Sequence, residues 1–134
     1  MMEIWKKYSL DIKLKDIYKN DAAVLMGLSA GAICWFSAGH SDSASFEGGD
    51  NWKYTIVGEM LGFFPYCFCP HYNEKGRDSF DHMISDTEYE GLALENEAAY
   101  VEKGGKQFII GSRNSTKAWL VSDNKKQELE VIHI

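Results

Sequence analysis

Apolar and polar residues follow one another along the chain in patterns that predict an α/β protein. Apolar residues recur at helical spacing over residues 10–19, which predicts an amphipathic helix there. Residues 22–28 are almost uniformly apolar, as in a parallel strand that is covered on both faces. Residues 32–38 predict a second helix. A helix, a short turn, a buried strand and a helix in this order indicate a doubly wound, mostly parallel sheet.

The remaining pattern predicts a smaller β region after this core. We expect strands at residues 53–57 and 66–69, with a helix over residues 73–89. Short strands separated by turn signals then follow at residues 91–94, 98–101, 107–110, 118–121 and 129–134. The last third is therefore predicted to be a β-meander appended to the α/β core. No repeat or linker interrupts the pattern, which predicts a single domain over residues 1–134.

Composition and charge exclude several classes of protein. The chain has 134 residues, of which 45% are hydrophobic, enough for one domain with a core of its own. The net charge of −6 argues against a general nucleic-acid binder, which would carry a basic face. No apolar run approaches the length of a membrane span, and the first residues lack a secretion signal, which predicts a cytoplasmic protein.

The three cysteines do not have the spacing of a metal site. Cys67 and Cys69 alternate along a predicted strand, and Cys34 lies apart from them in sequence. Zinc sites are built from more ligands at Cys-x-x-Cys-type spacing. We therefore expect three reduced, buried thiols and no metal.

The segment from Gly27 to Gly31 reads Gly-x-Ser-x-Gly and stands between the predicted buried strand and the helix after it. A serine at such a strand-to-helix turn exposes its hydroxyl at the edge of the sheet, above a helix N-terminus. The alternative interpretation is a turn of small residues that packs a helix against a sheet. The flanking strand and helix patterns favour the first interpretation, with Ser29 as a nucleophile.

A serine nucleophile requires a base, and His71 is the best placed of the four histidines. It directly follows the predicted strand 66–69, so it should emerge at the carboxyl edge of the sheet, where open α/β folds place their chemistry. His40 lies in the predicted loop after the helix that follows Ser29, and the pattern does not exclude it as the base. His82 within a helix and His133 in the last strand fit structural or solvated roles better.

A carboxylate should orient the base and stabilise its imidazolium. Glu95 is preferred because it follows the predicted strand 91–94 and so lies at a strand end. The pattern alone leaves four other acidic residues open: Asp42, Asp50, Glu59 and Glu97. Of these, Asp42 could instead line the substrate cleft.

A series of short motifs extends through most of the chain. They are residues 27–36, which read GLSAGAICWF, then His40-Ser41-Asp42-Ser43, Pro70-His71-Tyr72, Arg77, Phe80 and Met83, and finally residues 91–95, which read GLALE. This order resembles the peptidase E (aspartyl dipeptidase, cyanophycinase-like) family of serine peptidases. That family is similar in fold to the class I glutamine amidotransferases.

The resemblance implies a serine-type dipeptidase that hydrolyses a small peptide with an acidic N-terminal residue, without a cofactor or metal. It implies Ser29 as nucleophile, His71 as general base, Glu95 as the orienting acid and the Ala30 amide as an oxyanion donor. Asp42 falls where the family carries a functionally important aspartate, so we expect it to contact substrate. The order Ser, His, Glu differs from that of the α/β-hydrolases, and glutamine amidotransferases use cysteine at the elbow.

The chain departs from this family at its start. Family members carry further βα units before this point, ending in a Gly-Gly-Gly-Asn-type turn that supplies a second oxyanion amide, and nothing similar precedes the first helix. Loss of one such donor costs on the order of 100- to 1,000-fold in turnover. We therefore expect a partial domain whose uncovered strand edge pairs with a partner or a second copy. The alternative function is a catalytically impaired remnant that serves as a binding or subunit module.

Overall fold

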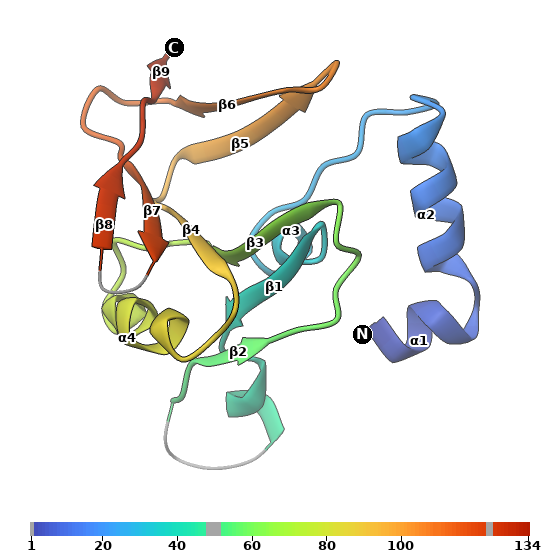
Figure 1. The fold of residues 1–134 in the computed structure, drawn as a ribbon, viewed down its shortest axis with the longest axis horizontal. Helices are drawn as coiled ribbons and strands as arrows, with labels where there is room; N and C mark the ends of the chain where they lie inside the picture. The colour runs from blue at the N-terminus through green and yellow to red at the C-terminus, as the bar shows by residue number, and fades with distance from the viewer. Residues whose placement is uncertain (1, 48–51, 123–124) are drawn as a thin grey trace.

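A six-stranded mixed sheet forms the body of the protein, in the order β2-β1-β3-β4-β7-β8 (Figure 1). The computed structural model describes residues 2–47, 52–122 and 125–134. The central pairs β1–β3 and β3–β4 are parallel, whereas β2, β7 and β8 join antiparallel. The strands are β1 (Phe36–Ser41), β2 (Thr55–Val57), β3 (Phe64–Cys69), β4 (Glu90–Leu94), β7 (Ala118–Ser122) and β8 (Lys125–Glu128).

A second, three-stranded sheet covers one face of this body. It consists of β5 (Ala98–Lys103), β6 (Lys106–Gly111) and β9 (Ile132–His133), with β5 antiparallel and β9 parallel to β6. Ile109 from β6 is buried against aromatic side chains of the main sheet. Among these, the rings of Phe36 and Phe68 stack at 4.4 Å. This aromatic layer is one of two hydrophobic clusters, because alternate residues of β3 and β4 point to opposite faces.

The other face of the main sheet is covered by η2 (Arg77–Ser79) and α4 (Phe80–Ser85). Phe80 and Ile84 are fully buried over β4, directly above Gly91. A Cβ on Gly91 would lie 2.7 Å from the Phe80 ring, so the missing side chain allows the helix to approach the strand. The short helix α3 (Ala30–Ile33) packs in the same way, with Ile33 against Gly39 of β1.

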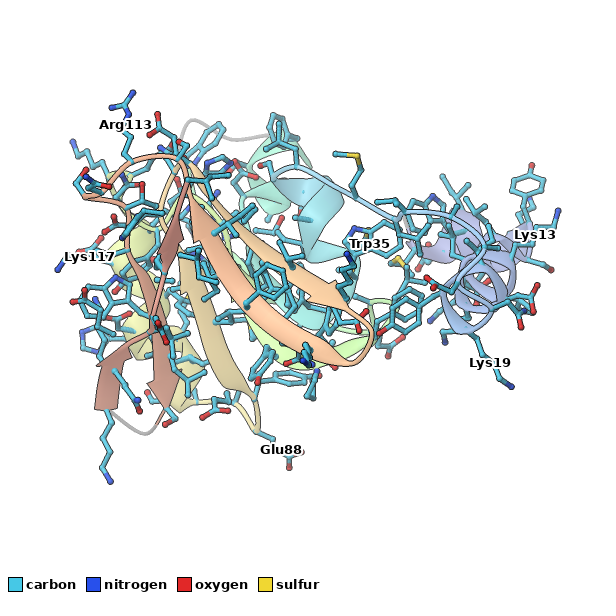
Figure 2. All side chains as sticks on the ribbon, turned by 90° about the horizontal axis from the view of Figure 1, so that it is seen from above. Lys13, Lys19, Trp35, Glu88, Arg113 and Lys117 are labelled. Atoms are coloured by element: carbon cyan, nitrogen blue, oxygen red, sulfur yellow. The ribbon has the colours of Figure 1, made fainter. Side chains whose placement is uncertain are left out.

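The first two helices, α1 (Met2–Lys7) and α2 (Leu10–Lys19), stand beside the sheet and do not cover it. Figure 2 shows them at one end of the molecule, with Trp35 at their junction with the body. Tyr18 stacks on Phe63 at 4.4 Å, and Lys6 pairs with Glu59 at 3.3 Å. Few contacts therefore hold these helices against the body. The prediction of a helix over residues 10–19 is confirmed.

The prediction of a buried strand at residues 22–28 is wrong for this structure. The segment forms no strand, and Val24, Met26 and Leu28 are 91%, 84% and 84% exposed. An apolar run becomes a buried strand only where neighbouring strands supply hydrogen bonds and other layers cover both faces. Among the described residues, nothing provides either to this segment.

The prediction of a mostly parallel sheet is also wrong, because the described sheet is mixed. β8 begins only three residues after β7 ends, which favours antiparallel pairing of these two strands, since parallel neighbours need a long crossover. The predicted helix at residues 32–38 ends at Ile33, and β1 begins at Phe36. The β-meander predicted for the last third of the chain is divided between two sheets. β5 and β6 belong to the second sheet, whereas β7 belongs to the main sheet.

Several other predicted elements differ in extent. The helix at residues 73–89 is limited to η2 and α4, and the last strand to β9. The sequence pattern missed β8, whose four residues are all exposed, because an edge strand without a buried face has no apolar alternation. The remaining predicted strands correspond to β2–β7, with boundaries that shift by up to two residues.

A buried polar cluster closes the carboxyl end of β1. His40 is completely buried, and its ring stacks on Tyr54 at 4.9 Å. Its Nδ1 lies 3.4 Å from both the Cys69 Sγ and an Arg77 guanidinium nitrogen, and its Nε2 lies 3.3 Å from the Ser79 hydroxyl. Burial and the adjacent Arg77 charge lower the pKa of His40 from 6.5 to about 4, although Asp42 opposes the shift. The ring is therefore neutral at pH 7.

We expect Gly91→Ala to destabilise the protein by about 1–3 kcal/mol, because the new methyl group overpacks the Phe80 ring. Gly58→Ala is the matched control, since its Cβ would meet only the Tyr89 hydroxyl at an ordinary 3.7 Å. Urea unfolding of both variants measures the difference. Equal stabilities for the two variants would contradict the close helix–strand contact.

The free energy of unfolding should fall as the pH falls from about 6.5 to about 4, in part because of His40. In this window the unfolded chain binds a proton that the folded protein excludes, so the stabilisation is complete above pH 6.5. His40→Gln should remove about 3 kcal/mol of this pH dependence. Urea unfolding at several pH values measures it, and parallel curves for the two proteins would disprove the assignment.

Candidate active site

Ser29 occupies a tight, strained turn at the start of α3. Its backbone has φ 53° and ψ −120°, a combination that residues with a side chain rarely adopt and that costs about 1–3 kcal/mol. The Gly31 N–H donates to the Leu28 carbonyl at 2.9 Å, and the N–H groups of Ala32 and Ile33 donate to the Ser29 carbonyl. The serine is half-buried at the first turn of the helix.

The two glycines beside Ser29 have different surroundings. A Cβ on Gly27 would lie 2.0 Å from the Gly31 carbonyl oxygen, so only glycine allows the turn to close on itself. A Cβ on Gly31 would meet nothing within 4 Å among the described residues. The turn is therefore tight on its inner side and open on its outer side.

His71 emerges where β3 ends, as its position after a buried strand predicts. Its backbone is also in the left-handed region, with φ 56°, and the Glu74 N–H closes the following turn onto the His71 carbonyl at 2.8 Å. The side chain is 26% exposed, so solvent or a ligand can reach the imidazole.

Asn96 and Glu74 are the direct neighbours of the His71 ring. His71 Nδ1 lies 2.5 Å from Asn96 Oδ1 and 3.7 Å from Glu74 Oε1. The Asn96 side-chain amide donates to Glu74 at 3.1 Å, and its backbone N–H donates to Asn73 Oδ1 at 2.9 Å. The sequence pattern did not single out either neighbour. Their signals were a polar residue just beyond the end of β4 and a carboxylate three residues after His71.

Glu95 faces a different strand. Its backbone N–H donates to the Lys117 carbonyl at 3.1 Å, and its carboxylate accepts the Lys117 N–H at 3.0 Å. Within the described residues no hydrogen bond joins Glu95 to His71, so its proposed role stays a prediction. The neighbouring Glu97 pairs with Arg113 at 2.7 Å.

The remaining predicted residues lie on separate elements. Asp42 follows β1 and is half-buried, and the Ala30 N–H belongs to the first residue of α3, where helix amides have no partner within the helix. In the part of the chain that the structure describes, no hydrogen bond connects Ser29 with His71. Asp50 lies outside the described residues.

The other histidines are either fully buried or lie outside the central parallel strands β1, β3 and β4. His40 is buried and neutral, as described above, while His82 on α4 and His133 on β9 are exposed. Glu59, the remaining candidate acid, pairs with Lys6 of α1.

The cysteines are all buried and free. Burial raises the pKa of Cys34 to about 11 and that of Cys67 to about 12, and it raises the pKa of Cys69 further. These thiols are therefore protonated at neutral pH. Residues 2–47, 52–122 and 125–134 contain no group of three or more His, Cys, Asp or Glu that could hold a metal ion. Nor do they contain a helix long and apolar enough to cross a membrane.

Comparison with known proteins places the chain in a family. Residues 1–110 match peptidase family S51. The chain is 35% identical over 125 residues to YgaJ, an uncharacterized peptidase of Bacillus subtilis (strain 168). The alignment covers 90% of this chain and 50% of the relative, so the chain spans about half the length of the curated relative it matches. No solved structure matches the chain. These matches confirm the resemblance to the peptidase E family, and the chain belongs to peptidase family S51.

Proposed function

We propose that the protein is a serine-type peptidase in which Ser29 is the nucleophile and His71 the general base. The observation that carries the proposal is the strained turn at Ser29, with φ 53° and ψ −120°, at the start of a helix. Strain of this kind persists only where the surrounding structure holds it, and it is common at active sites. The accessible imidazole at the end of a central parallel strand adds support.

In this mechanism the Ser29 Oγ attacks the peptide carbonyl carbon while the His71 imidazole accepts its proton. The same proton then passes to the leaving amine as the C–N bond breaks, which leaves an acyl-enzyme. Water, deprotonated by His71, attacks the ester, and His71 returns the proton to the Ser29 oxygen as the C–O bond breaks and the acid product leaves. The Ala30 N–H, at the N-terminus of α3, would stabilise the oxyanion.

The finer parts of the proposal come from the family resemblance. They are dipeptide hydrolysis with preference for an acidic N-terminal residue, cytoplasmic location, Glu95 as the orienting acid and Asp42 as a substrate contact. The three central parallel strands β1, β3 and β4 are consistent with a class I glutamine amidotransferase-like sheet.

A second candidate function is a binding or subunit module. It is favoured by the exposed apolar segment at residues 22–28, hereafter the elbow approach segment, and by the open space beside Gly31. Residues 2–19 carry five lysines against three acidic residues, whereas the whole chain has a net charge of −6. This opposite charge favours a second copy of the chain as the partner that covers the elbow approach segment.

A fluorophosphonate probe should label Ser29, because an activated serine displaces fluoride from phosphorus. Ser29→Ala should abolish the labelling. Ser43→Ala, which changes an exposed serine after β1, should retain it. Mass spectrometry of the labelled peptide identifies the site.

Absence of labelling in the unaltered, folded chain would reject the active-enzyme proposal and favour the module. Circular dichroism of the same samples confirms that each protein is folded when it meets the probe.

The module proposal predicts a dimer or larger assembly that Met26→Lys disrupts, because the lysine would place a charge within the apolar elbow approach segment. Ile134→Lys, at an exposed apolar position outside both this segment and the lysine-rich residues 2–19, is the control and should leave the assembly intact. Light scattering after size-exclusion chromatography gives the mass. A monomeric unaltered chain would exclude self-association through this segment.

A further inference from the structure

The hydrogen bonds around His71 determine which of its ring nitrogens carries the proton. A carboxylate accepts hydrogen bonds and cannot donate, so the Asn96 group that faces Glu74 at 3.1 Å must be its NH₂. The Asn96 carbonyl oxygen then faces the imidazole, 2.5 Å from Nδ1. Because that oxygen only accepts, the His71 Nδ1 must donate. In the neutral ring this leaves Nε2 unprotonated and able to accept a proton.

Two further contacts hold Asn96 in this orientation. Its backbone N–H donates to the Asn73 side chain, and the Tyr72 N–H donates to the Leu94 carbonyl at 2.9 Å. The two residues that follow His71 thus tie the turn after β3 to the end of β4. The Glu74 carboxylate itself lies 3.7 Å from Nδ1.

We propose that Asn96, oriented by Glu74, is the positioning residue that fixes the Nδ1–H tautomer of His71 and so makes Nε2 the base for Ser29. This inference rests on the proposed function. It gives the orienting role to the Asn96 amide, held by Glu74, in place of the Glu95 carboxylate that the family resemblance implies. A neutral asparagine can serve this purpose, because orientation requires a fixed acceptor at Nδ1. The Glu95 carboxylate instead accepts a hydrogen bond from the backbone N–H of Lys117, just before β7.

The test is ¹⁵N NMR of the histidine rings, followed to the alkaline plateau of the titration. In the unaltered protein, Nδ1 of His71 should appear protonated and Nε2 unprotonated. Asn96→Ala should shift the ring to a mixture of tautomers and slow fluorophosphonate labelling on the order of 100-fold, the lower end of what a general base contributes. Asn114→Ala, in the exposed turn before β7, is the control and should change neither.

A paired variant separates positioning from simple structural support. In Glu74→Gln combined with Asn96→Asp, the new amide at position 74 donates to the new carboxylate, whose other oxygen still accepts from Nδ1. This protein should recover the Nδ1–H tautomer and most of the labelling rate, within about tenfold of the unaltered protein. A merely structural role for Asn96 would give no such recovery of the NMR signature.

An unchanged tautomer in Asn96→Ala would overturn the inference. If Glu95→Gln then loses the tautomer, the orienting role belongs to Glu95. The NMR readout does not depend on catalysis. If the unaltered protein shows the Nδ1–H tautomer but Ser29 is never labelled, the proposed function fails while the assignment of Asn96 stands.

Discussion

Parallel pairing of β3 with β4 is the constraint on which the candidate site depends. The register places Cys69 opposite Ala93, and the ladder continues past the strand ends through the Tyr72 N–H and the Leu94 carbonyl. Parallel strands end at the same edge of a sheet, so the residue after one strand meets the residue after the next. His71 and Asn96 are neighbours for this reason, although they stand 25 positions apart in the sequence.

Environment separates the roles of two histidines at the carboxyl ends of adjacent strands. His40 is enclosed by Tyr54 and Arg77, where burial and a neighbouring positive charge keep it neutral. His71 is partly exposed and faces a carboxylate and an amide. A ring that must gain and lose a proton needs access to solvent or substrate, so His71 suits acid–base chemistry and His40 suits packing.

The turn around Ser29 is determined locally, whereas the apolar segment before it is exposed in the described part of the chain. Contact between Gly27 and the Gly31 carbonyl, together with the hydrogen bonds of α3, accounts for the turn without help from a strand. The apolar residues that precede it remain exposed in the described part of the chain. Burial of that segment would remove apolar surface from water and hold Ser29 more firmly. Both the catalytic proposal and the module proposal therefore involve residues 22–28.

The sequence by itself determined the helix at residues 10–19, most of the strands, the Gly-x-Ser-x-Gly turn and the position of His71 at a strand end. These follow from local periodicity and from backbone angles that only certain residues allow. Only the tertiary structure decided that residues 22–28 pair with no strand in the described part of the chain, that the sheet there is mixed and that Asn96 and Glu74 contact His71. Strand pairing and side-chain contacts join residues far apart in sequence, and a local pattern of apolar and polar positions does not predict such long-range contacts.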